Sequence, residues 1–179
     1  AATPFGNNNG TVSLGDGTQT SSITIGSKEG TTAVFGFNIV ITAGNGGTGR
    51  FAQLGFQSSD QGSSYTISGT ISLRLKNNLR LNGGSGGAFN YAQIGHIGAD
   101  TTSDSNSEGR VTANIVLAVG GNIVITGGVE LSAFAQLGHG GYNAIALYLG
   151  IYQLLTPEVR SSLEDGSGNG YSRLGNDDL

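Results

Sequence analysis

The stretch Asn122–His139 reads NIVITGGVELSAFAQLGH, and it decides the fold because recognisable copies of it occur three times in the chain. It has three parts: a strand-like NIVIT, a Gly-rich link and the aromatic-led FAQLGH. Apolar residues at every second position of NIVIT indicate a β-strand with one buried face. A unit that recurs in this way is typical of repeat architectures, in which each unit buries its apolar face against the next.

Two earlier copies precede this stretch. NIVIT beginning at Asn38 is followed by FAQLGF beginning at Phe51, and NLRLN beginning at Asn78 is followed by YAQIGH beginning at Tyr91. Phe51 and Tyr91 are 40 residues apart, and Phe134 follows 43 residues later. A Gly-rich link joins the two parts in every copy. The spacing predicts three units, each of about 40 residues.

A third apolar segment comes before NIVIT in each unit. It reads ISLRL at residues 71–75 and IVLAV at residues 115–119, with a weaker counterpart around residues 31–35. Each unit is therefore predicted to run as a strand, a tight turn, a second strand, a Gly-rich link, an aromatic-led strand and a variable loop.

Such units favour an all-β fold, a right-handed parallel β-helix (β-solenoid) with atypical capping ends. Links of two to seven residues within a unit are too short for crossover helices. We expect each unit to hold two turns of about 20 residues, because repeats of that size are common in solenoids. A β-sandwich is the alternative, but it requires no sequence identity between distant strands.

Equivalent residues of a solenoid stack into ladders along its axis, and Asn or Gln side chains can ladder through their amides. The predicted structural ladders are Phe51, Tyr91 and Phe134; Gln53, Gln93 and Gln136; Gly55, Gly95 and Gly138; and Asn38, Asn78 and Asn122. The aromatic residues have a second interpretation, as an exposed strip that binds sugars. We favour an interior or corner ladder.

Composition supports strands and turns. The chain has 33 Gly among 179 residues and only 11% charged residues, whereas about 7% Gly and about 25% charge are usual. It contains no Cys, which excludes disulfides, thiolate metal sites and Cys nucleophiles. The net charge is −4 and the eight Lys and Arg are spread along the sequence, so we expect no nucleic-acid partner. No segment is predicted to cross a membrane.

The chain divides into three regions. Residues 1–30 are predicted to form N-terminal turns or a cap, residues 31–141 the three-unit repeat region, and residues 142–179 a C-terminal cap with an assembly tail. The apolar run at residues 142–155 fits either a capping helix or closing strands, and a short helix is predicted from Thr156 through Ser162. Composition, with small residues at the start of the sequence, favours a secreted or cell-surface protein.

Candidate sites are few. His96 and His139 occupy matched positions, where they either bind a metal or serve as turn or surface histidines; Phe56 at the third position favours turn or surface histidines, and no metal or cofactor is predicted. Asp100, Asp104 and Glu108 form the densest acidic cluster, which suits a hard cation, a solvated loop or an adhesion loop.

The quoted repeats, NIVITAG with FAQLG, NLRLNGGSGGAFNYAQIGH and GGNIVITGGVELSAFAQLGHGG, resemble those of filamentous haemagglutinin-like exoproteins and large autotransported adhesins. The resemblance covers roughly residues 36–141. It implies export, a right-handed parallel β-helix, and a role in adhesion or in surface fibres. It carries over no binding residues, because the shared motif is structural.

Two functions follow as expectations. The first is a structural subunit that stacks end to end into an extracellular filament, with a tail containing Tyr171, Arg173 and Leu174 that locks neighbouring copies. The second is an adhesin module that binds glycan or host protein through surface loops. A polysaccharide-degrading enzyme is a weaker alternative, because such enzymes need paired carboxylates and the repeat strands carry almost no acids.

Overall fold

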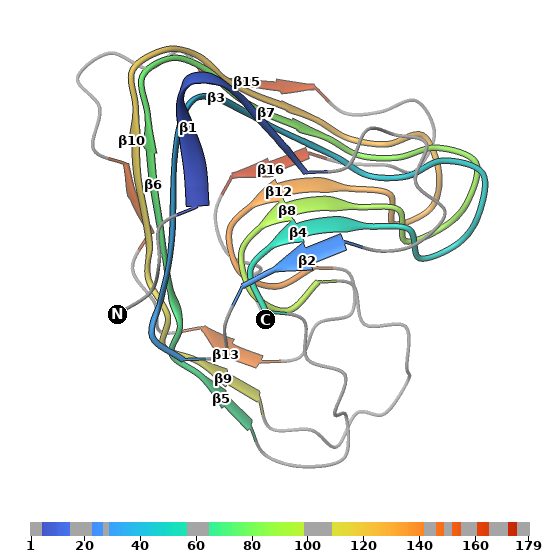
Figure 1. Cartoon of the computed structure of the whole chain (residues 1–179). Helices are drawn as coiled ribbons and strands as arrows, with labels where there is room; N and C mark the ends of the chain where they lie inside the picture. The colour runs from blue at the N-terminus through green and yellow to red at the C-terminus, as the bar shows by residue number, and fades with distance from the viewer. Residues whose placement is uncertain are drawn as a thin grey trace.

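The computed structural model describes residues 5–14, 23–26, 29–56, 65–98, 109–141, 146–148, 152–154, 161–164 and 172–174 (Figure 1). These residues form strands, turns and bends, and no helix occurs among them. None of the described segments is therefore a helix long and apolar enough to span a membrane. The fold is all-β.

The second and third repeat units each contribute four strands, β5 to β8 and β9 to β12. The described strands are β1 (Phe5–Leu14), β2 (Ile23–Ile25), β3 (Thr31–Thr42), β4 (Ala52–Leu54), β5 (Tyr65–Ile67), β6 (Thr70–Leu75), β7 (Leu79–Asn82), β8 (Ala92–Ile94), β9 (Gly109–Val111), β10 (Ile115–Val119), β11 (Ile123–Thr126), β12 (Ala135–Leu137), β13 (Ala146–Tyr148), β14 (Tyr152–Leu154), β15 (Ser161–Glu164) and β16 (Ser172–Leu174). In the first unit, β3 spans the positions that β6 and β7 occupy in the second.

The strands form three parallel sheets. The large sheet has the order β14-β10-β6-β3-β7-β11-β15, with β1 beside β3. The middle sheet has the order β16-β12-β8-β4-β2, and the small sheet has the order β13-β9-β5. The middle sheet lies inside the bend of the large sheet (Figure 1). A β-sandwich would contain antiparallel pairs, whereas all the described ladders are parallel.

The strand register shows that each unit forms one layer. Ile39 pairs with Leu79, and Leu79 pairs with Ile123, its counterpart in the next unit. The prediction of two turns of about 20 residues in each unit is wrong. The strands of one unit lie in different parts of the three sheets, so the partner of each strand comes a whole unit later in the chain.

The third segment of the unit is confirmed as a strand. Residues 31–36 of β3 pair in register with residues 70–75 of β6. Residues 71–75 in turn pair with β10. The weaker sequence counterpart around residues 31–35 therefore occupies the same structural position as ISLRL and IVLAV.

Strands continue at both ends of the repeat region. At the N-terminal side, β1 pairs with β3 and β2 pairs with β4. At the C-terminal side, β13, β14, β15 and β16 pair with the four strands β9 to β12. Of the two alternatives for residues 142–155, the described parts are strands, at 146–148 and 152–154.

The helix predicted to end at Ser162 is wrong where it can be tested, because Ser161 and Ser162 lie in β15. Residues 156–160 are outside the described residues. The polar tail, expected to be loop-like, contains β16. In both places a parallel ladder to a strand about 40 residues earlier outweighs the weak local signal.

The core fills the space between the large and middle sheets. Inward-facing Ile and Leu side chains of the large sheet alternate with exposed or half-buried residues, as period-2 strands require. They pack against small and branched side chains of the middle sheet, including Ala92, Ile94 and Leu137. A second, smaller cluster contains Ile67, Ile97, Val111 and Ala113, with Phe56 packed against it.

Candidate functional site

Three side-chain columns run through the interior from unit to unit. The first is aromatic. The rings of Phe51 and Tyr91 stack with centroids 4.6 Å apart and planes inclined by 5°, and those of Tyr91 and Phe134 stack at 4.7 Å and 3°. Tyr91 is 1% exposed and Phe134 is 0% exposed. Rings buried to this extent offer no face to a sugar, and they act as packing between units.

The second column contains the glutamines, all of them buried. Gln53 Nε2 donates to the carbonyl of Gly95 at 2.9 Å, and Gln93 Nε2 donates to the carbonyl of Gly138 at 3.0 Å. Gln93 Nε2 also contacts the carbonyl of Gly140. Gln53 and Gln93 thus bond backbone carbonyls of the next unit, whereas Gln136 Nε2 donates to the carbonyl of His139 in its own unit at 3.0 Å. They satisfy buried carbonyls that would otherwise be costly to bury.

The glycines that follow the glutamines are required by close backbone approach. Gly55, Gly95 and Gly138 have φ of 154°, 157° and 154°. A Cβ on Gly55 would lie 1.8 Å from the oxygen of Gly95, and one on Gly95 would lie 1.8 Å from the oxygen of Gly138. No side chain fits such a gap, which explains the Gly at this position of the motif in the first and second units.

The third column contains the two histidines, each 1% exposed, so a surface position for them is wrong. Their rings stack with centroids 5.1 Å apart. Nδ1 of His96 accepts from the Phe56 backbone N–H at 2.9 Å, and Nδ1 of His139 accepts from the His96 backbone N–H at 3.1 Å. Nε2 of His139 donates to the Ala113 carbonyl at 3.0 Å, and Nε2 of His96 contacts the Gly69 carbonyl. Each ring thus accepts a hydrogen bond from a backbone N–H and, through its other nitrogen, contacts a backbone carbonyl 26 or 27 residues earlier in the chain.

This geometry holds both imidazoles neutral. Burial lowers the pKa of His96 from its usual 6.5 to about 4, against a smaller raising effect of the Gly69 bond. Burial, and secondarily the neighbouring His96, lowers the pKa of His139 to about 3. Both ring nitrogens are occupied by backbone partners, so these histidines are poorly placed to ligate a metal. The described residues contain no cluster of three or more candidate metal ligands.

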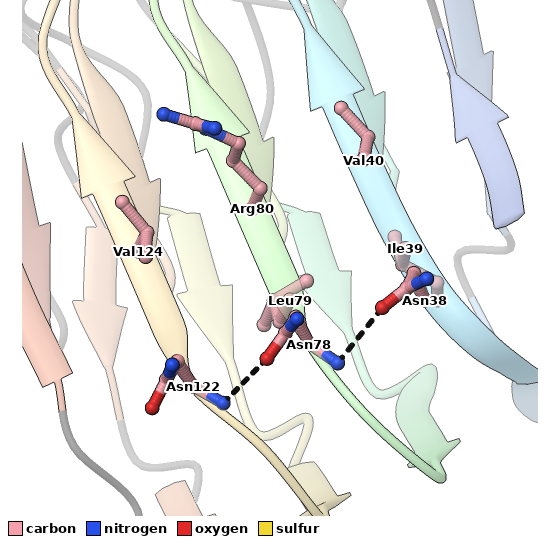
Figure 2. Close-up of a pocket in the computed structure, with 8 residues that line it drawn as sticks. All are labelled: Asn38, Ile39, Val40, Asn78, Leu79, Arg80, Asn122 and Val124. Carbon is pink, nitrogen blue, oxygen red and sulfur yellow. Dashed lines mark hydrogen bonds between the residues drawn. The ribbon is translucent and has the colours of Figure 1, made fainter.

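The asparagine column lies at the surface. Asn38 Oδ1 accepts from the Asn78 backbone N–H at 3.1 Å, and Asn78 Oδ1 accepts from the Asn122 backbone N–H at 2.8 Å. The asparagine ladder therefore runs from the side-chain oxygen of one unit to a backbone N–H of the next. Each bond fixes its amide group, and Figure 2 shows the two bonds as dashed lines.

A shallow groove of about 290 Å³ lies beside the asparagine column, and sequence reasoning did not find it. Its lining residues come from three successive units: Asn38, Ile39, Val40, Asn78, Leu79, Arg80, Asn122 and Val124. Val40, Arg80 and Val124 are in register across β3, β7 and β11 (Figure 2). The sequence feature that could have indicated this groove is Arg80 in NLRLN, because both other units have Val at that position.

The other predicted site residues lie either outside the described residues or within β16. Asp100, Asp104, Glu108 and Tyr171 lie outside the described residues. Arg173 and Leu174 lie in β16 and pair with Gln136 and Leu137 of the same chain. This part of the predicted assembly tail is thus paired within the chain, and its role between copies stays a prediction.

Comparison with known proteins gives no relative: no family model, no curated protein and no solved structure matches the chain. The resemblance to haemagglutinin-like repeats therefore stays a prediction.

Proposed function

We propose that this chain is a structural subunit, a right-handed parallel β-helix that stacks end to end into an extracellular filament. The parallel register between units that lie about 40 residues apart supports the β-helix. The hydrogen-bonding columns support a structural role, because their bonds join one unit to the next. Composition and the resemblance to exported fibre proteins support a location outside the cell.

One observation carries the assembly proposal: the middle sheet ends on β2 at one side and on β16 at the other. Edge strands present backbone donors and acceptors that can pair with another chain. Pairing of β16 from one copy with β2 of the next is a heterologous contact. Such a contact, when its rotation does not close a ring, produces an open fibre.

A point mutation at Thr24 can test whether the outer edge of β2 pairs with another copy. The Gly55 N–H donates to the Ile25 carbonyl, so Ile25 directs its backbone groups toward β4. Alternate residues of a strand direct their groups to opposite sides. The backbone groups of Thr24 therefore face away from β4, toward the position of an added strand.

The test is negative-stain electron microscopy of the purified chain and two variants. Thr24→Pro removes the outward N–H, whereas Thr24→Val retains it and is the matched control. We expect filaments from the natural chain and from Thr24→Val, and dispersed particles from Thr24→Pro. Dispersed particles from the natural chain at high concentration, or unchanged filaments from Thr24→Pro, would contradict the proposal.

A further inference from the structure

The outer face of the large sheet carries a row of cations along the second unit. Arg74 lies in β6, Arg80 lies in β7, and Lys76 lies in the turn between them; all three side chains are exposed. Although the eight cations are spread along the sequence, three of them fall on this one bent strand pair. The row is a local positive feature on a chain with a net charge of −4.

Apolar side chains flank each arginine. The register places Arg74 between Phe35 and Ala118. Arg80 lies between Val40 and Val124 in the same way (Figure 2). These four flanking residues are half-buried, and each arginine is exposed between its apolar neighbours.

No carboxylate competes for the row within these strands. The sequences of β3, β6, β7, β10 and β11 contain no Asp or Glu. The nearest acid in the described strands of this sheet is Glu164 in β15. It pairs with Thr126 of β11, and β11 separates β15 from β7. An anionic ligand can therefore approach the row without meeting a like charge on the central strands.

The groove adds hydrogen-bond donors to the charge. Because Asn78 Oδ1 accepts the Asn122 backbone N–H, its amide NH₂ points away from that bond, and it lies immediately before the strand that carries Arg80 (Figure 2). The groove lining thus offers the amide of Asn78, a guanidinium and apolar surface, and contains no acid. Guanidinium groups pair with carboxylates through two parallel hydrogen bonds.

We propose that this face binds an extended acidic polysaccharide, whose carboxylates pair with Arg74, Lys76 and Arg80 and whose sugar rings pack on the flanking apolar side chains. A repeating anionic chain matches cations spread along an extended strand pair better than a compact anion does. Binding on the side of the molecule leaves the terminal strands free, so it is compatible with stacking of copies end to end and independent of it.

The test is isothermal titration of the full chain at low ionic strength with polygalacturonate, with neutral dextran as the uncharged probe. The triple variant R74Q/K76Q/R80Q removes the row. Arg110→Gln, an exposed arginine of the small sheet, is the control. We expect binding of polygalacturonate but not of dextran, about a tenfold loss in the triple variant, equivalent to about 1.4 kcal/mol, and less than a twofold change in the control.

Three results would overturn the proposal: no binding of polygalacturonate, an equal loss in Arg110→Gln, or binding of double-stranded DNA or dextran sulfate as tight as that of polygalacturonate and equally weakened by the triple variant. The last result would mean that the row binds polyanions according to their charge density alone. Thermal unfolding of each variant verifies folding. If the triple variant does not fold, Arg80→Gln alone takes its place, with an expected loss of about threefold.

Discussion

The interior of the middle sheet and the outer face of the large sheet follow opposite rules. Inside, the unit repeats Gln53, Gln93 and Gln136 without change, and Gly follows two residues later each time. Outside, the register aligns Val40 with Arg80 and then with Val124. Interior side chains such as Gln53, Gln93 and His96 bond the backbone of a neighbouring unit, so one substitution affects two layers. Outer side chains such as these are not confined in this way, so they can differ between units and carry binding chemistry.

The largest effect is expected from Gly95→Ala. A Cβ there would lie 1.8 Å from the Gly138 oxygen, so two layers must separate. We expect loss of folding, or a destabilisation of more than about 4 kcal/mol, measured by urea unfolding. The control is Gly49→Ala, where φ is 71° but nothing lies within 4 Å of the added Cβ. It should cost only about 1 kcal/mol. Equal losses in the two variants would refute the role assigned to close approach.

Lowering the pH should destabilise the same interior, because the unfolded chain binds protons at its two histidines more readily than the folded chain does. The folded chain binds protons to His96 only near pH 4 and to His139 only near pH 3, whereas the unfolded chain binds them near pH 6.5. This contribution to stability is therefore complete above pH 6.5 and is lost as the pH falls toward 4 and 3. The expected slope is at most about 1.4 kcal/mol per pH unit for each histidine.

The measurement is the free energy of unfolding between pH 8 and pH 4. His96→Phe, which introduces the residue found at the matched position Phe56, should reduce stability at pH 8 because it removes two backbone bonds. It should also reduce the slope, because one titrating group is gone. A slope that does not change in the variant would show that His96 is not the group responsible.

A smaller loss is expected from Gln93→Leu, which keeps the approximate volume of the side chain but removes its donor. The carbonyls of Gly138 and Gly140 lose this side-chain donor. We expect a destabilisation of about 2 to 3 kcal/mol by urea unfolding. The control is Asn82→Leu, at a half-buried position on the outer face, which removes bonds to the side chains of Thr42 and Arg80 but none to a backbone carbonyl of the interior. A loss of stability in Gln93→Leu no larger than in Asn82→Leu would contradict the difference between the interior of the middle sheet and the outer face of the large sheet.

The smallest effect is expected from Arg80→Val, which makes the outer column identical in all three units. The side chain is exposed, so stability should change by less than about 0.5 kcal/mol in urea unfolding. A destabilisation above about 1 kcal/mol would mean that the outer face is also constrained by packing.

The sequence was sufficient to predict three strands of each repeat unit and the residues that stack, because period-2 alternation and near-identical motifs are local signals. It did not predict β5 and β9, which lie in stretches predicted as variable loop. It did not predict that each unit forms one layer, since strand partners are chosen by long-range pairing. The backbone partners of the Gln and Asn side-chain amides, carbonyls for Gln53 and Gln93 and N–H groups for Asn38 and Asn78, were not predicted for a similar reason: they belong to the next unit. The three residues of β16 are too few for a periodic signal, and only their ladder to β12 defines them.

The groove was not predicted because its lining comes from three units and its only sequence mark is one arginine in an otherwise apolar column. Residues outside the described segments, among them Asp100, Asp104 and Glu108, stay predictions.

X-ray fibre diffraction from aligned assemblies of the purified chain tests the central claim most directly, namely that parallel layers stack along one axis and that copies continue the stack. Strands perpendicular to that axis are spaced about 4.8 Å apart. We expect filaments with a strong reflection at about that spacing along the fibre axis. Filaments whose strand-spacing reflection lies across the axis, or a chain that forms no filaments, would contradict it.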